Sequence, residues 1–174
     1  MSDATRPYRL MALNNAWANA TFYRRLDGVG PVELGLKRPG FFPSLKKTLN
    51  HILLVDLYYI DALTEGGQGL ALRDMAPLRD VPALARAQAK ADEALTTFCH
   101  QIAPETLGQT RVTQRDSGPI EETVEALLLH LFQHQIHHRG QAHVQLQTTG
   151  ILPPQLDEFY LEYDRAASAR DYFA

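Results

Sequence analysis

The stretch of the chain most suited to chemistry is HLFQHQIHHRGQ, residues 130–141, which holds four histidines and one arginine. Histidine is only a moderate helix former, so a cluster this dense indicates a chemical purpose rather than a choice made for helix stability. Imidazole rings bind divalent metals, transfer protons near neutral pH and respond to pH. Which of these uses is open to the chain depends on how the surrounding elements place the rings.

The histidines of this region do not all share one face if the segment is a single helix. Each residue of a helix advances by about 100°, so with His134 at zero, His138 falls at about +40° and His130 at about −40°. On the same wheel His137 falls at about −60° and His143 near 180°. The apolar positions that mark the buried stripe fall between about +20° and +120°; they are Ile120, Val124, Leu127, Leu131, Ala142 and Leu146. His134 and His138 therefore lie at the stripe, and the other three are edge or surface groups.

His134 and His138 are four residues apart, so their imidazoles lie about one helical turn from each other. This is the spacing with which HxxxH segments bind one divalent ion. It fits equally well two core-edge histidines whose ring nitrogens are satisfied by neighbouring polar groups. A metal site with an open coordination position needs a third protein ligand, and the other expected helices offer His51, Asp56 and His100. Periodicity does not choose among these three.

The three candidates differ in their expected surroundings. Asp56 falls on the inner face of the segment that follows Ser44, where a carboxylate orients a ligand, binds the metal itself or accepts a hydrogen bond from another helix. His51 falls on the flank of the same face. His100 falls near the C-terminus of its helix, where a histidine commonly interacts with the helix dipole.

The sequence predicts a mostly helical chain, because four long stretches carry helical periodicity between Gly- and Pro-rich breaks. We expect helices over residues 7–26, from the N-cap Ser44 to the glycine pair at 66–67, over 81–102 and over 120–149. Residues 104–119 carry threonine and valine in loose alternation before Asp-Ser-Gly, which indicates a short hairpin or extended excursion. A short amphipathic helical tail is expected over 155–174.

Two residues that follow the histidines are unusual in the middle of a helix. Glycine costs about 1 kcal/mol relative to alanine in a helix interior, so Gly140 indicates close approach of another helix. We expect Arg139 to hold a neighbouring terminus in place. Gln141 is expected to hydrogen-bond across the core or near a metal.

The composition predicts one globular domain over residues 1–174, with 45% hydrophobic and 21% charged residues. A formal charge of −3 and a pI near 6.1 give no general attraction to a phosphate backbone, so no nucleic-acid partner is expected. We find no signal peptide and no segment apolar enough for a bilayer, and we expect a cytoplasmic protein without a membrane partner. Cys99 is the only cysteine, which excludes an internal disulfide and any multi-thiolate zinc site within one chain.

These motifs resemble the DinB family of small bacterial helical proteins, a group that is similar to the YfiT-like metal-dependent hydrolases. The resemblance rests on LNHILLVD in the second expected helix, HQIHHRGQ in the fourth and the exit GILPP. It implies an all-α four-helix bundle in up-down-down-up order, often a homodimer, here with a short hairpin or excursion before the last long helix. It also implies that His51, His134 and His138 are the metal ligands, and it leaves Asp56 and Gln141 as supporting groups.

A site of three histidines would typically hold zinc or nickel, with iron a further option, and water would fill the remaining positions. The resemblance implies a metal-dependent enzyme acting on a small molecule, either a hydrolase or a transferase that uses a low-molecular-weight thiol. The alternative is a non-enzymatic bundle that the metal holds together, with a stress-related binding role. No catalytic base is identified, and Asp56, Gln141 and the Tyr58–Tyr59 pair are candidates by position only.

Overall fold

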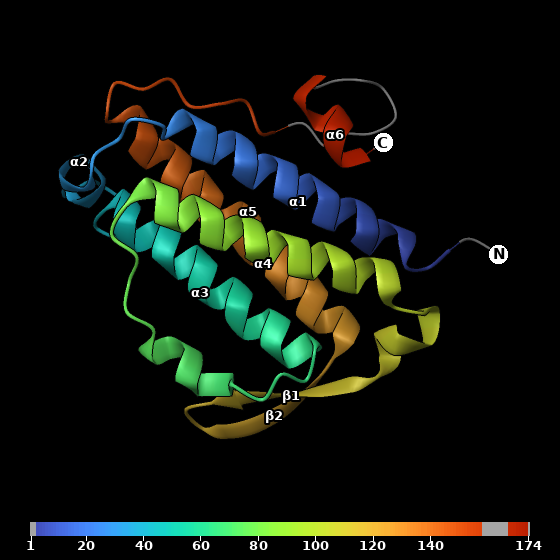
Figure 1. Ribbon diagram of the computed structural model, residues 1–174. Helices are drawn as coiled ribbons and strands as arrows, with labels where there is room; N and C mark the ends of the chain where they lie inside the picture. The colour runs from blue at the N-terminus through green and yellow to red at the C-terminus, as the bar shows by residue number, and fades with distance from the viewer. Residues whose placement is uncertain (1–2, 158–166, 174) are drawn as a thin grey trace.

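The computed structural model of the chain describes residues 3–157 and 167–173, which are mostly helical (Figure 1). Four long helices form the body: α1 (Arg6–Arg25), α3 (Leu45–Leu63), α4 (Val81–Gln101) and α5 (Val124–Gln147). The short helices are α2 (Pro31–Gly35) and α6 (Arg170–Phe173), with 3-10 turns η1 (Gly69–Asp74), η2 (Pro104–Gly108) and η3 (Ala167–Ala169). No helix in these described ranges is long and apolar enough to cross a membrane.

The long helices pack in pairs that are not neighbours in the sequence. α1 packs along α4, α3 packs along α5, and further contacts join α3 to α4 and α1 to α5 (Figure 1). The core between them is dominated by fully buried leucines, each of which contributes about 1.5–3 kcal/mol relative to exposure. These leucines are Leu45, Leu63, Leu84, Leu95, Leu127, Leu128, Leu131 and Leu146. The pairing of α3 with α5 brings the histidine-bearing helices face to face.

Side-chain caps fix where the two histidine-bearing helices begin. Ser44 accepts a hydrogen bond from the backbone N–H of Lys47 at 3.3 Å, which confirms it as the N-cap of α3. Thr123 accepts one from the backbone N–H of Ala126 at 3.2 Å and caps α5. Because a helix is regular, each cap sets the direction in which the histidines further along that helix point.

The excursion before the last long helix is an antiparallel hairpin of β1 (Thr110–Arg115) and β2 (Gly118–Thr123). The hairpin prediction is therefore confirmed, but α5 begins later than expected because the residues before Val124 belong to β2. Ile120 pairs with Thr113 across the hairpin and is 44% exposed, so its assignment to the buried stripe of the helix is wrong.

The end of the chain was expected to form a helical tail over residues 155–174, of which 158–166 lie outside the described residues. In the part that is described, η3 and α6 pack against α1. The indole nitrogen of Trp17 donates a hydrogen bond to Ser168 Oγ at 3.0 Å, and Trp17 is buried beside Ala169. The tail thus covers one side of α1.

Candidate metal centre

Three histidines from two helices converge on one point. His134 and His138 lie one turn apart on α5, and His51 faces them from α3. The Nε2 atom of His51 lies 2.9 Å from Nε2 of His134 and 3.2 Å from Nε2 of His138. The potential ligand nitrogens of the group all lie within 4.8 Å of one another. Nitrogens bound tetrahedrally to one zinc ion at 2.0–2.1 Å lie about 3.4 Å apart, so this spacing is close to that of a bound site.

The chemistry of these nitrogens fits a cation better than it fits mutual hydrogen bonding. A ring nitrogen of neutral imidazole is either a donor or an acceptor, and its single N–H points in one direction. Nε2 of His51 faces two other Nε2 atoms, and because it carries either one N–H or one lone pair, it can form a good hydrogen bond with only one of them. A divalent ion between the three rings would accept a lone pair from each and remove this conflict.

Burial keeps the three rings in the form that binds metal. Desolvation, followed by the charge of His138, lowers the pKa of His51 to about 4. Desolvation, followed by the neighbouring histidines, lowers the pKa of His134 to about 3. The pKa of His138 is also lowered by desolvation, although its hydrogen bond to Gln141 acts in the opposite direction. Metal ligation requires neutral imidazole, so the rings are ready to bind at neutral pH.

Gln141 orients one of the three rings. Its Oε1 lies 2.9 Å from Nδ1 of His138, so that Nδ1 donates and Nε2 presents its lone pair to the centre. The amide nitrogen of Gln141 lies 2.9 Å from Nε2 of His137, which is itself exposed. His137 therefore supports the centre through Gln141 and does not face it. For His134, in the described residues, Nδ1 is buried without a hydrogen-bond partner.

Asp56 belongs to a different part of the core. Its carboxylate accepts hydrogen bonds from the side-chain amides of Gln88, at 2.6 Å, and of Gln135. Burial, and then the neighbouring charge of Asp92, raise the pKa of Asp56 well above its usual range. The hydrogen bonds of Asp56 thus tie α3 to α4 and α5.

The remaining histidines lie outside the group of three. His100 is exposed on α4, with Nδ1 2.8 Å from the carbonyl oxygen of Thr96. His143 lies on the other side of α5, with Nε2 3.0 Å from the carbonyl oxygen of Pro154. Of the three candidates for a third ligand, the structure brings His51 to the pair on α5.

Aromatic rings enclose the centre on two sides. Phe42 has its ring centroid 4.5 Å from that of His51 and 5.6 Å from that of His138. On the other side His130 stacks on His134 at 6.2 Å and lies 4.7 Å from the ring of Tyr59. The sequence interpretation missed Phe42 because Phe42 lies in an irregular segment before α3, where helical periodicity gives no information about the direction of a side chain. The available signal was its position two residues before the N-cap Ser44.

A hollow of about 290 Å³ opens beside the centre. His51 forms part of its wall, together with Leu54 and Leu57 of α3 and with Arg73 and Met75 from the segment that follows α3. The wall is mostly apolar, and its one cation, Arg73, pairs with Asp116 at 2.8 Å. The hollow therefore provides space for a small molecule next to a candidate ligand.

Two neighbours of the histidines differ from the sequence interpretation. Arg139 is buried and donates hydrogen bonds to Oδ1 of Asn15 at 2.7 Å and of Asn19 at 2.9 Å. It therefore holds the middle of α1, not a neighbouring terminus. Gly140 is exposed, and a Cβ there would meet nothing within 4 Å among the residues that the structure describes. The predicted close approach of another helix of this chain to Gly140 is wrong.

The fold and the centre together define a helical protein with a three-histidine candidate metal site. The family model described as "DinB family" matches residues 1–169, and the chain belongs to that family. The resemblance inferred from the sequence motifs is thereby confirmed.

Individual relatives agree with this assignment. The chain is similar to "Protein DinB" of Bacillus subtilis (strain 168), with 25% identity over 152 residues that cover 82% of this chain and 86% of that protein. The crystal structure of a DinB-like protein from Bacillus subtilis superposes with a TM-score of 0.65 and 17% identity, covering 88% of this chain and 99% of the other. The crystal structure of a DinB-like protein from Bacillus cereus ATCC 10987 superposes with a TM-score of 0.62 and 18% identity, covering 80% of this chain and 90% of the other. These structures share the fold.

Proposed function

We propose that His51, His134 and His138 bind one divalent metal ion, zinc or nickel or else iron, and that the chain is a metal-dependent enzyme acting on a small molecule. The observation that carries this proposal is the convergence of three Nε2 atoms from α3 and α5. Structural zinc normally has four protein ligands, whereas three leave a coordination position for a reactant.

The reaction is hydrolysis or transfer to a low-molecular-weight thiol. A metal ion in this position supplies one thing, a lowered pKa for the water or thiol that it binds, and hence a nucleophile at neutral pH. The chain's own residues do the rest: Gln141 orients His138, and Phe42 covers the rings and limits the access of water. The hollow beside His51 has room for an apolar group.

The family resemblance also supports an up-down-down-up bundle that assembles as a homodimer, and we include both in the proposal. The bundle order is supported by the course of the chain, since α1 and α5 run in one direction and α3 and α4 in the other (Figure 1). The homodimer is supported by large apolar side chains on the outer face of α5, each about half exposed; these are Leu129, Ile136 and Val144.

Elemental analysis of protein purified without a nickel column or chelator tests the metal site. We expect about one divalent ion per chain in the wild type and none in a His51→Ala variant. His143→Ala is the matched control, because His143 lies on α5 but outside the centre, and it should keep its metal. Wild-type protein that stays metal-free after reconstitution would leave the second candidate, a non-enzymatic helical bundle with a stress-related binding role.

The two reactions are separated by replacing the metal with cobalt(II), whose absorption reports its ligands. Addition of a low-molecular-weight thiol should produce a sulfur-to-cobalt charge-transfer band if the thiol binds at the centre, and the corresponding alcohol should not. Absence of the band at saturating thiol would reject the transferase and leave hydrolysis.

A further inference from the structure

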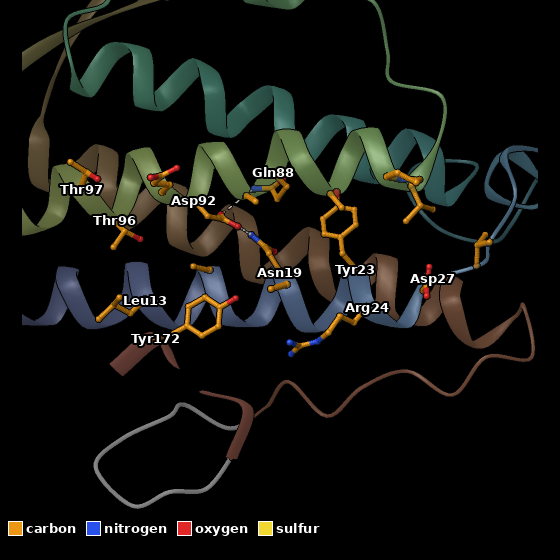
Figure 2. Close-up of a pocket in the computed structure, with 18 of the residues that line it drawn as sticks. Leu13, Asn19, Tyr23, Arg24, Asp27, Gln88, Asp92, Thr96, Thr97 and Tyr172 are labelled. Atoms are coloured by element: carbon orange, nitrogen blue, oxygen red, sulfur yellow. Dashed lines mark hydrogen bonds between the residues drawn. The ribbon is translucent and has the colours of Figure 1, made fainter. Parts of the chain in front are cut away.

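A groove with a cavity of about 910 Å³ lies between α1 and α4 (Figure 2). This pair of helices differs from the pair that carries the three histidines. The groove exists because small side chains face each other across this pair: Ala16 and Ala20 on α1, Ala85 and Ala89 on α4. Its lining contains none of the three histidines. The cavity is therefore a separate site from the candidate metal centre.

The floor of this cavity is polar, with Asn19 and Tyr23 from α1 and Gln88 and Asp92 from α4 turned toward the space between the helices (Figure 2). All four are buried, Tyr23 at 8% exposure and Gln88 at 1%. In the part of the chain that the structure describes, neither Oη of Tyr23 nor Oε1 of Gln88 has a hydrogen-bond partner. Most buried polar atoms in proteins are satisfied, so two unsatisfied atoms in one floor indicate a missing partner.

The carboxylate in the floor has amide neighbours but no cation in direct contact among the described residues. Asp92 accepts hydrogen bonds from Asn15 at 3.3 Å, from Asn19 at 3.0 and 3.2 Å and from Gln88 at 3.2 Å. Arg139 donates instead to the oxygens of the two asparagines and, at 3.5 Å, to Oε1 of Gln135. Burial raises the pKa of Asp92 to about 7, against the opposing effects of these hydrogen bonds and of Arg139. A ligand cation would complete the site.

The hydrogen-bonding atoms of the floor that lack a partner determine which kind of ligand fits. Oε1 of Gln88 and the carboxylate of Asp92 only accept hydrogen bonds, and the hydroxyl of Tyr23 can accept one. A protonated primary amine offers three donors and no acceptor, which matches this set. The exposed rim adds Asp27 and Glu93 against one arginine, Arg24, so its charge also favours a cation. The alanine walls suit an apolar body.

We propose that the groove between α1 and α4 binds a small organic amine in its protonated form. The ammonium group lies on the floor at Gln88 and Asp92, and the apolar body lies along the alanine walls. This site acts independently of the proposed metal function, because the two share no lining residue.

Titration calorimetry of the full chain with n-hexylamine tests the proposal, with n-hexanol and hexanoate as probes of equal length. Hexylamine should bind at least tenfold more tightly than either. Ala89→Phe fills the groove from an exposed position and should weaken hexylamine binding at least tenfold. Ala94→Phe is the matched control, since Ala94 is also exposed on α4 but lies outside the groove, and it should bind like the wild type. Asp92→Asn, which removes the charge, should also weaken binding.

Three results would overturn the proposal. Hexanol binding as tightly as hexylamine would mean that the groove is a general apolar surface. Loss of hexylamine binding in metal-free His51→Ala would place the amine at the candidate metal centre. Finally, if Ala89→Phe converted dimers to monomers in sedimentation while hexylamine failed to bind the wild type, a second copy of the chain would be the occupant.

Discussion

The core of this protein contains two buried polar clusters that are built in opposite ways. In the histidine cluster of α3 and α5, like groups point at one another, and Nε2 of His51 faces two further Nε2 atoms. In the amide cluster of α1, α4 and α5, asparagine and glutamine side chains separate the charges of Arg139 from those of Asp56 and Asp92.

This difference distinguishes a site that binds an external ion or ligand from a cluster that stabilises the fold. Ring nitrogens that converge without satisfying one another indicate an external cation. Amides that donate to a carboxylate and accept from a guanidinium satisfy both charges in place and need nothing further. Among the described residues the amide cluster departs from this pattern at Oδ1 of Asp56, and where Gln88 and Tyr23 face the groove. At the groove it also indicates a ligand.

The largest expected effect is on metal retention. Replacing His134 with alanine removes one of three ligands, and we expect elemental analysis to find no metal in the variant. Circular dichroism should show an unchanged helical spectrum, because the leucine core does not depend on the ring. A variant that still carried one ion per chain would contradict the assignment of the centre.

The next largest effect is on stability. Arg139→Met removes the hydrogen bonds to Asn15 and Asn19 and also the buried positive charge that acts through them on Asp56 and Asp92. Leaving buried charge uncompensated costs about 3–5 kcal/mol. Urea unfolding should show this loss in the free energy of unfolding. Arg86→Met, at an exposed position of α4, is the control and should change it by less than about 0.5 kcal/mol. Equal effects of the two substitutions would remove the structural role of the amide cluster.

The amide cluster should also respond to pH. Burial raises the pKa of Asp92 in the folded state from its ordinary value of 3.8 to about 7, so the folded state binds the proton more tightly. The resulting stabilisation is full below the unfolded pKa and is lost as pH rises toward and through 7. Between pH 5.5 and 7.5 the free energy of unfolding of the wild type should fall by about 2 kcal/mol relative to Asp92→Asn. Glu93→Gln, an exposed neighbour, should show no such difference.

A smaller effect is expected at the ring that Gln141 orients. Gln141→Ala frees Nδ1 of His138, and loss of a group that orients a ligand typically weakens metal binding by about tenfold or more. Competition with a chelator measures this affinity. Gln133→Ala, exposed on the same helix, should leave it unchanged, and unchanged affinity in both variants would show that the Gln141 contact is incidental.

The sequence predicted what depends on a single helix and failed where separate helices meet. Helical periodicity was enough to choose His134 and His138, because both lie on α5. It left His51, Asp56 and His100 open, since the partner helix is set by tertiary packing; only the family resemblance favoured His51. The same limit explains the error at Arg139, whose partners lie on α1.

Local signals had their own limit at the start of α5. The hairpin was visible from its turn residues, but apolar Ile120 fits a strand and a helix equally well in a short window. The prediction for Gly140 was wrong because a glycine in the middle of a helix does not tell which neighbour, if any, requires the absence of a side chain. In the described part of the chain, nothing lies within 4 Å of where a Cβ of Gly140 would be.

Thr123 is both the last residue of β2 and the N-cap of α5, so no linker separates the hairpin from the helix. An inserted residue just after it would turn everything that follows by about 100° relative to the hairpin. His134 and His138 would then leave α3, and Leu131 would leave the core. Among related sequences the length of this junction should therefore be fixed.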